Sequence, residues 1–411
     1  MRRINSSLGK PLIRQVLDWH QQPATSNQHS RLIGTVKLMT DASLVMTDQS
    51  IPDYAGGSLL NLVAELEHRL TGSAPAERLH PHLTDTIPNA RTYVLVLFDG
   101  LGDHQLQHPG AASLLAARTA HLDAVFPTTT SVNLATVATG LAPAAHGLIA
   151  HQLYVPAVGQ VVNTLKWATP WGDQVNLDHG SFLPKPNLWE RLVRHGIEPI
   201  TVQPGHFQDS PLSRVLYRGS RYEAVWTVDE IIDATTQLAA VPGRFIFTYF
   251  PNVDVAAHVG GQNSDEYAAA ISTATGIWDR IATSLPAGAV MVGTADHGHI
   301  DYDEQDKVLI PHRPGPEFYG DPRTVLVRRS DAGFAESIPE LPCRSVEPSD
   351  YRMWLGPGRN HPDLAGRLPD RVLLADPGKL VIPRFMDKRL TGYHGGLADQ
   401  EIKIPLLLAG G

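Results

Sequence analysis

Residues 93–100, YVLVLFDG, are the stretch that decides the fold. Six apolar or aromatic residues run from Tyr93 to Phe98 without a break, and Asp99 and Gly100 end the run. A continuous run of this kind is typical of a strand buried on both faces of a sheet, whereas a strand with one face in water alternates. The stretch therefore predicts a central parallel strand, with Asp99 at the point where the strand enters a loop.

Other segments repeat this pattern and alternate with helical ones. We expect helices in PNLWERLVRHG (186–196) and over residues 264–285, where Ser264 is a suitable N-cap. Strands that alternate with helices indicate an α/β fold, in which a mostly parallel central sheet carries helices on both faces. The further strands are expected in EPITVQP (198–204), GRFIFTYFP (243–251), GAVMVGTADHG (288–298) and KIPLLLAG (403–410).

The alternation of predicted strands and helices, and the points where it breaks, indicate four parts of the chain. Residues 1–90 form an N-terminal lead-in packed on the core, with a small hairpin over 31–47 and a helix over 56–70, and residues 91–300 form the core. Residues 301–390 are rich in proline, arginine and glycine, and we expect an inserted, cap-like subdomain that is mostly β or irregular. Residues 391–411 return to the core with the last strand. A further antiparallel hairpin is expected within 149–167.

Composition excludes several classes of protein. The 411 residues contain one cysteine, so neither an intrachain disulfide nor a thiolate zinc cluster is possible. The formal charge of −8 argues against a partner such as a nucleic-acid polymer, which needs a basic surface. No segment has the apolar run of a secretory signal or of a membrane span. We therefore expect a cytoplasmic protein that has no membrane partner.

Acidic and histidine residues stand where the predicted strands end. In open α/β sheets, ligands bind at the carboxyl ends of the strands, so these side chains should converge at one edge. Imidazole and carboxylate groups together suit zinc, with manganese or iron as lesser options. Together with one hydroxyl they suffice for two divalent metal ions, which clamp the attacking and leaving oxygens of a phosphoryl transfer. The residues are Asp99, Thr130, Asp254, His258, Asp296, His297 and His394.

Thr130 is the candidate nucleophile. It precedes a helical segment, TSVNLATVATG (130–140), and a helix N-terminus favours an anion. Metal coordination would lower the pKa of its hydroxyl and activate it. Thr129 and then Ser131 are the competing hydroxyls. Two divalent ions and three aspartates leave one net positive charge, which suits a monoanionic phosphodiester, whereas a dianionic monoester would call for a further arginine or lysine.

These segments resemble the alkaline phosphatase superfamily, and within it the nucleotide pyrophosphatase/phosphodiesterase branch. The resemblance rests on VLVLFDG, FPTTTSVNLATVATGLAPAAHG (126–147), the spacing of Asp254 and His258, TADHG and the late HGG, and it covers about residues 93–411. It implies an alkaline-phosphatase-like fold. It also implies that Asp254, His258 and His394 hold one metal ion, and that the other is held by Asp99, Thr130, Asp296 and His297. Thr130 would attack phosphorus, and water would hydrolyse the covalent intermediate.

Two positions depart from that branch. Thr129 stands where a lysine is frequent, and His151 stands where the diesterases usually carry a phosphate-binding asparagine. Asn133 matches an asparagine of the family block, so Asn133 and His151 are both candidate substrate-binding residues. His299 is a candidate for a residue that contacts a metal ligand without binding the ion itself. The alternative is an exposed residue of the loop. Trp167, Trp171 and Tyr154 are candidates for stacking on a base or for ordinary packing.

The predicted function is therefore metal-dependent hydrolysis of a phosphodiester or pyrophosphate bond in a small phosphorylated substrate, with nucleotides among the candidates. A phosphomonoesterase or phosphonate hydrolase on the same scaffold is the first alternative. A binding protein that keeps the fold without turnover is the second, and the presence of every ligand position speaks against it.

Overall fold

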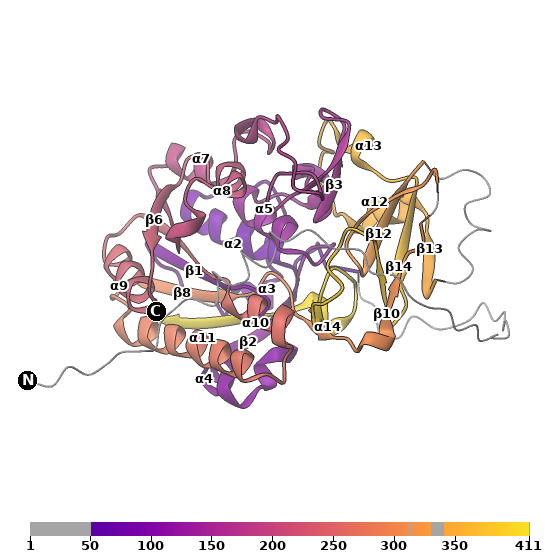
Figure 1. The fold of residues 1–411 in the computed structure, drawn as a ribbon. Coiled ribbons are helices and arrows are strands. Elements are labelled where there is room, and N and C mark those ends of the chain that lie inside the picture. The colour runs from indigo at the N-terminus through magenta and orange to yellow at the C-terminus, as the bar shows by residue number, and fades with distance from the viewer. Residues whose placement is uncertain (1–50, 313, 330–340, 411) are drawn as a thin grey trace, which may run out of the picture.

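A computed structural model describes residues 51–312, 314–329 and 341–410. The hairpin predicted over 31–47 lies outside these residues. The centre of the molecule is a seven-stranded sheet with the order β2-β17-β8-β1-β7-β5-β6 (Figure 1). Its strands are β1 (Thr92–Phe98), β2 (Arg118–Asp123), β5 (Glu198–Pro204), β6 (Arg221–Val225), β7 (Arg244–Phe250), β8 (Ala289–Thr294) and β17 (Lys403–Gly410).

Strand β1 occupies the middle of this sheet, as its apolar run predicts. All seven of its residues are buried, and it pairs in parallel with β7 on one side and β8 on the other. Strands β5 and β6 continue the parallel arrangement beyond β7. Strand β17 runs antiparallel to both β8 and β2. The prediction of a mostly parallel central sheet is confirmed.

Helices cover both faces of the sheet (Figure 1). One group packs together on one face, where α5 contacts α2, α7 and α8. A second group packs on the other face, where α11 contacts α4, α9 and α10. The helices of the first group are α2 (Leu59–Thr71), α5 (Thr130–Thr139), α7 (Leu188–Arg194) and α8 (Pro211–Leu216), and those of the second are α4 (Ala112–Ala117), α9 (Val228–Ala239), α10 (Asn252–Gly260) and α11 (Asp265–Ser284).

Helix ends follow the local sequence. The Ser264 side chain accepts a hydrogen bond from the Tyr267 N–H at the start of α11, as expected of an N-cap. Helix α5 begins at Thr130 and ends at Gly140, whose φ of 62° is left-handed and therefore favours glycine. The remaining helices are short: α3 (Pro81–Thr84), α6 (Pro143–His146), α12 (Pro348–Trp354), α13 (Leu364–Arg367) and α14 (Asp399–Ile402), with 3-10 turns η1 (His104–Gln107), η2 (Pro109–Ala111), η3 (His179–Ser181), η4 (Gly205–Phe207) and η5 (Glu304–Asp306).

A second, smaller sheet stands beside the main body (Figure 1). It is antiparallel, with the order β11-β12-β14-β13, and it has its own apolar cluster around Val325, Val327 and Leu373. Two-stranded pairs join β10 to β15 and β9 to β16, and the predicted hairpin within 149–167 is confirmed as β3 paired with β4. These strands are β3 (Gln152–Val155), β4 (Gln160–Asn163), β9 (Ile300–Asp301), β10 (Lys307–Leu309), β11 (Glu317–Gly320), β12 (Thr324–Arg328), β13 (Cys343–Val346), β14 (Arg371–Ala375), β15 (Leu380–Ile382) and β16 (Gly392–Tyr393).

None of the helices within the described ranges combines the length and the apolar character that crossing a membrane requires.

Candidate active site

The carboxyl edge of the central sheet gathers the predicted residues. Asp99 follows β1, and Asp296 and His297 follow β8. Asp254 lies in the first turn of α10, directly after β7, and His258 lies one turn further along the same helix. The remaining two residues come from elsewhere: Thr130 is the first residue of α5, and His394 follows β16. Contacts between their side chains show that all seven converge.

Asp254, His258 and His394 form a first group. The Nε2 atom of His258 lies 3.4 Å from Oδ1 of Asp254 and 3.2 Å from Nε2 of His394. The third distance, from His394 Nε2 to Asp254 Oδ1, is 3.7 Å. Zinc–nitrogen bonds of about 2.0–2.1 Å place the ligand atoms of a tetrahedral site about 3.3 Å apart. The spacing of these three atoms therefore fits a single divalent ion.

The tautomers of the two histidines support this fit. His258 Nδ1 lies 2.7 Å from the Gly392 carbonyl oxygen, and His394 Nδ1 lies 2.7 Å from the Thr128 carbonyl oxygen. A carbonyl oxygen only accepts, so each Nδ1 carries the hydrogen and each neutral ring presents a lone pair at Nε2. Two lone pairs that face each other across 3.2 Å repel unless a cation lies between them. A backbone carbonyl behind each ring is also usual for histidines that bind metal ions.

Asp99, Thr130, Asp296 and His297 form a second group. His297 Nε2 lies 3.1 Å from Thr130 Oγ1, 3.5 Å from Asp99 Oδ1 and 3.4 Å from Asp296 Oδ2. These two carboxylate oxygens are buried and have no hydrogen-bond partner among the residues that the structure describes. A buried carboxylate oxygen without a partner is costly. The donor set therefore fits a second divalent ion.

The other oxygen of each carboxylate is held by the protein. The Tyr249 hydroxyl donates to Asp99 Oδ2. The Gly100 and His297 N–H groups donate to Asp296 Oδ1, each at 3.1 Å. Each carboxylate is thus fixed through one oxygen and presents the other to the site, which is the arrangement expected around a metal centre.

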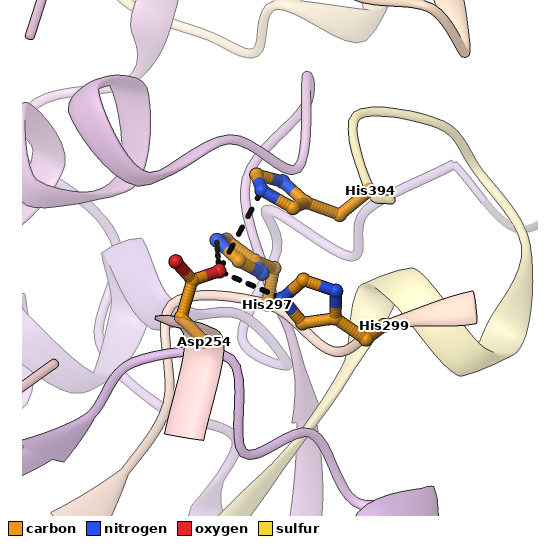
Figure 2. A group of neighbouring side chains, drawn as sticks. All are labelled: Asp254, His297, His299 and His394. Atoms are coloured by element: carbon orange, nitrogen blue, oxygen red, sulfur yellow. Dashed lines mark hydrogen bonds and ion pairs between the residues drawn. The ribbon is translucent and has the colours of Figure 1, made fainter. Parts of the chain in front are cut away.

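The two groups adjoin each other, and Figure 2 shows His297 of the second group beside Asp254 and His394 of the first. His297 Nε2 lies 4.0 Å from Asp254 Oδ1, and the rings of His297 and His394 stack with centroids 3.6 Å apart. Two ions held by the two groups would be near neighbours, as a phosphoryl-transfer clamp requires.

The site sets the charge state of its groups. Burial raises the pKa of Asp99 well above its usual range, and the neighbouring Asp296 and Asp254 add to this. Burial would also raise the pKa of Asp254, but His258, His299 and His394 hold it well below its usual range. Burial lowers the pKa of His258 to about 4, and burial with the other histidines lowers the pKa of His394 well below 6.5. The imidazoles of this group are therefore neutral at pH 7, as metal ligands must be.

His299 is a residue of the site that the sequence left undecided. It is buried, and its Nε2 lies 2.7 Å from Asp254 Oδ1. This distance is a hydrogen bond and is shorter than the 3.2–3.7 Å between the atoms of the first group. Its ring contacts those of His258, His297 and His394, with centroids 4.7, 5.5 and 5.0 Å away. The available signal was its position two residues after His297, in DHGH.

The ring of His299 occupies a fitted slot. A Cβ at Gly100 would lie 2.9 Å from its Cδ2, and a Cβ at Gly392 would lie 3.0 Å from its Nδ1. Glycine at both positions therefore leaves room for the ring, which lies beside Asp254 (Figure 2). The distance and the slot indicate that His299 orients the Asp254 carboxylate.

Asn133 holds the loop before the nucleophile. Its Oδ1 accepts from the Val125 N–H at 2.8 Å, and its Nδ2 lies 3.2–3.3 Å from the carbonyl oxygens of Val125, Pro127 and Thr129. The side chain is fully buried, and these backbone contacts use its amide. The geometry does not support direct substrate binding by Asn133, because the amide is already engaged.

His151 has a fixed orientation. Asn163 Oδ1 accepts from the N–H groups of Leu165 and Lys166, so its Nδ2 faces His151 Nε2 at 3.2 Å and donates to it. Nε2 therefore accepts, and the neutral His151 ring carries its hydrogen at Nδ1.

The three aromatic candidates for stacking on a base lie in different surroundings. Trp167 is buried and packs on Phe182, and Tyr154 lies under the Arg328 guanidinium. Trp171 is 73% exposed and meets Phe385 edge to face. Ordinary packing therefore accounts for Trp167 and Tyr154.

The chain is similar in sequence to one known family and in fold to several solved structures. The sequence model of a family described as type I phosphodiesterase / nucleotide pyrophosphatase matches residues 93–396. No curated protein matches the sequence. Similar solved structures include murine ectonucleotide pyrophosphatase / phosphodiesterase 5, with a TM-score of 0.59 and 18% identity over 78% of this chain and 88% of that chain.

A second similar structure is phosphonoacetate hydrolase from Sinorhizobium meliloti 1021 in complex with phosphonoacetate. Its TM-score is 0.57, with 17% identity over 78% of this chain and 91% of that chain. An inactive variant of the murine protein in complex with AMP gives a TM-score of 0.58 with 17% identity, over 77% of this chain and 87% of that chain. At these identities the likeness shows the shared fold.

Proposed function

Because the chain belongs to the type I phosphodiesterase / nucleotide pyrophosphatase family, we propose that it hydrolyses phosphodiester or pyrophosphate bonds with two divalent metal ions and with Thr130 as the nucleophile. The single observation that carries the proposal is the geometry of the second group, Asp99, Thr130, Asp296 and His297. Thr130 Oγ1 lies 3.1 Å from His297 Nε2, next to carboxylate oxygens of Asp99 and Asp296 that lack hydrogen-bond partners among the described residues.

The first ion would be held by Asp254, His258 and His394, and the second by Asp99, Thr130, Asp296 and His297. Such ions, with zinc as the proposed metal, would lower the pKa of the Thr130 hydroxyl and stabilise charge on the phosphoryl oxygens. Thr130 Oγ1, whose proton passes to solvent, would form a bond to phosphorus while the bond to the leaving oxygen breaks and that oxygen takes up a proton. Water would then attack phosphorus, lose a proton and break the bond from phosphorus to Thr130 Oγ1, which regains a proton. Thr130 is the first residue of α5, and the N-terminus of a helix favours an anion.

The charge of the site supports a phosphodiester over a monoester. Three carboxylates oppose two divalent ions, and histidines bind metal ions as neutral rings, so one positive charge remains for a monoanionic substrate while Thr130 keeps its proton. A phosphonate hydrolase is the second candidate, since phosphonoacetate hydrolase has a similar fold. A small phosphorylated molecule, such as a nucleotide, is the expected substrate of a phosphodiesterase, and a small phosphonate is that of a phosphonate hydrolase.

Replacing the nucleophile tests the proposal. Thr130→Ala should lower turnover of bis-p-nitrophenyl phosphate by about 10³-fold or more, because the covalent route is lost. Metal content, measured by mass spectrometry of the elements, should stay at one ion or more. Thr129→Ala is the matched control and should keep most of the turnover, since the Thr129 side chain makes no cap bond to α5.

Two results would count against the proposal. Full activity of Thr130→Ala would mean that another group attacks phosphorus. A preference of more than about tenfold for p-nitrophenyl phosphate or for a phosphonate, equivalent to about 1.4 kcal/mol in the barrier, would replace the diesterase assignment by the corresponding alternative.

A further inference from the structure

Thr128 lies two residues before Thr130, but its hydrogen bonds go to the loop that carries His394. Its hydroxyl accepts from the Gly395 N–H at 3.1 Å and donates to the Gly396 carbonyl oxygen at 2.9 Å. Its own carbonyl oxygen accepts from His394 Nδ1 at 2.7 Å. One buried residue is thus bonded to three consecutive residues that lie more than 260 positions away in the chain.

The opposite side of the same loop is held by other elements. Gly395 O accepts from Thr324 Oγ1 at 2.7 Å, and the Gly396 N–H donates to Glu401 Oε1 at 2.9 Å. Gly395 has a φ of 116°, and a Cβ there would lie 2.8 Å from Cβ of Asp321. The loop therefore has a fixed backbone with little space to shift, and Thr128 links it to the segment that carries Thr130.

We propose that Thr128 is a positioning residue that ties His394, a ligand of one metal position, to the segment that carries Thr130 at the other. This rests on the proposed function, in which His394 belongs to one metal position and Thr130 to the other. The carbonyl oxygen of Thr128 holds the His394 ring in position. In this position its Nε2 lies 3.2 Å from His258 Nε2, and its face stacks on His297. The same residue fixes the backbone that leads into Thr130, so the spacing between the two positions depends on it.

The hydroxyl is the part of Thr128 that can be removed without changing its shape. It acts as donor and acceptor at once, so only serine can replace it. Valine has the same outline but would leave the Gly395 N–H and the Gly396 carbonyl without these bonds. Residue 128 would then be bonded to the loop through its main-chain carbonyl alone, so the ring of His394 would be held less firmly at its distance from His258 and Asp254. The carboxylates around the second position would keep their own hydrogen bonds.

The test compares Thr128→Val, Thr128→Ser and Thr235→Val in the full chain. Thr235 on α9 shares a hydroxyl bond of 3.0 Å with Thr248 in the core, so Thr235→Val controls for loss of a buried hydroxyl elsewhere. Each protein is stripped with a chelator and titrated with zinc against a competing chelator, and bound zinc is counted. Thr128→Val should bind one of its two ions about 10- to 100-fold more weakly. Thr128→Ser and Thr235→Val should bind both ions as the wild type does.

The melting temperature of the metal-free proteins separates positioning from a general loss of stability. Metal-free Thr128→Val should melt within a few degrees of metal-free Thr235→Val. Wild-type affinity of Thr128→Val for both ions, or equal weakening of both, would overturn the inference. Failure of the wild type to bind two ions would instead overturn the proposed function on which it rests. If valine prevents folding, Thr128→Ala lacks the same hydroxyl in a smaller side chain and decides by the same criteria.

Discussion

At the scale of single residues, the site is built from groups whose charge state is set by their surroundings. The carbonyl oxygens of Gly392 and Thr128 direct the lone pairs of His258 and His394 into the site. Burial and neighbouring histidines keep these rings neutral, while Asp254 stays ionised. Asp99 differs, because burial and two neighbouring carboxylates favour its protonated form.

The difference predicts an order in which the ions leave as the pH falls. Protons compete little for the group of Asp254, His258 and His394 until about pH 4, since the pKa values of all three are lowered. A cation at the Asp99 group must displace a proton whose binding is favoured by the raised pKa of Asp99. Zinc content between pH 8 and pH 4.5 should therefore fall from two ions to one before it falls to none.

A matched variant checks the assignment of this order. Asp99→Asn should bind one ion and should lack the first step of zinc loss. Simultaneous release of both ions from the wild type, or a first step that persists in Asp99→Asn, would be incompatible with the difference between the two groups.

Two substitutions of His299 distinguish a hydrogen-bond donor to Asp254 from a metal ligand. The amide nitrogen of glutamine can stand near the position of Nε2, so His299→Gln should keep the bond to Asp254, whereas His299→Leu removes it. Zinc affinity should fall about 10- to 100-fold in His299→Leu and much less in His299→Gln. If both variants lose affinity equally, and the absorption spectrum of the cobalt-substituted protein changes in both, His299 binds the ion directly.

At the scale of elements, apolar segments that alternate with helical ones predicted the strands β1, β5, β7, β8 and β17. The edge of the sheet was harder to predict. Strands β2 and β6 leave residues such as Ala120 and Glu223 partly exposed, so neither contains a continuous apolar run. The antiparallel direction of β17 was also not predicted, because direction depends on the path of the preceding chain rather than on the strand's own residues.

In the candidate site, too, some residues could be predicted from the sequence and others could not. The metal-ligand candidates follow apolar runs or stand in family motifs, so the sequence could find them. His299 and Thr128 act through contacts with residues distant in the chain, which local sequence does not report. Asn133 was proposed for substrate from the family block, but its amide holds the 125–129 loop.

The loop before α5 gives a prediction at this scale. Asn133→Ala removes the acceptor for the Val125 N–H and leaves buried backbone groups without partners. The free energy of unfolding of the metal-free chain, measured with urea, should fall by about 1–3 kcal/mol. Asn263→Ala, at an exposed position after α10, should change it by less than about 0.5 kcal/mol. An unchanged stability of Asn133→Ala would return Asn133 to the role of a substrate-binding residue.

At the scale of the whole molecule, the smaller sheet is joined to the main body beside the site. Arg323 and Glu401 are both buried and form an ion pair of 3.2 Å between the turn before β12 and α14. Arg323 also donates to the Lys379 carbonyl oxygen at 2.7 Å, and Glu401 accepts from the Gly396 N–H. The pair therefore connects the smaller sheet to the loop of His394.

Breaking this pair predicts a large loss of stability. Arg323→Met leaves the Glu401 carboxylate buried without its partner, which should lower the free energy of unfolding by about 3–5 kcal/mol. Arg371→Ala breaks the exposed pair with Glu347 and should cost less than about 1 kcal/mol. Urea unfolding of both variants checks this, and similar effects of the two would mean that the buried pair does not join the two sheets.

The central claim is that two divalent ions bind at one edge of the sheet with Thr130 beside them. Anomalous diffraction from crystals grown with zinc tests this most directly. We predict two peaks, one within bonding distance of Asp254, His258 and His394 and the other within bonding distance of Asp99, Thr130, Asp296 and His297. The absence of zinc from either position at saturating concentration would contradict the account.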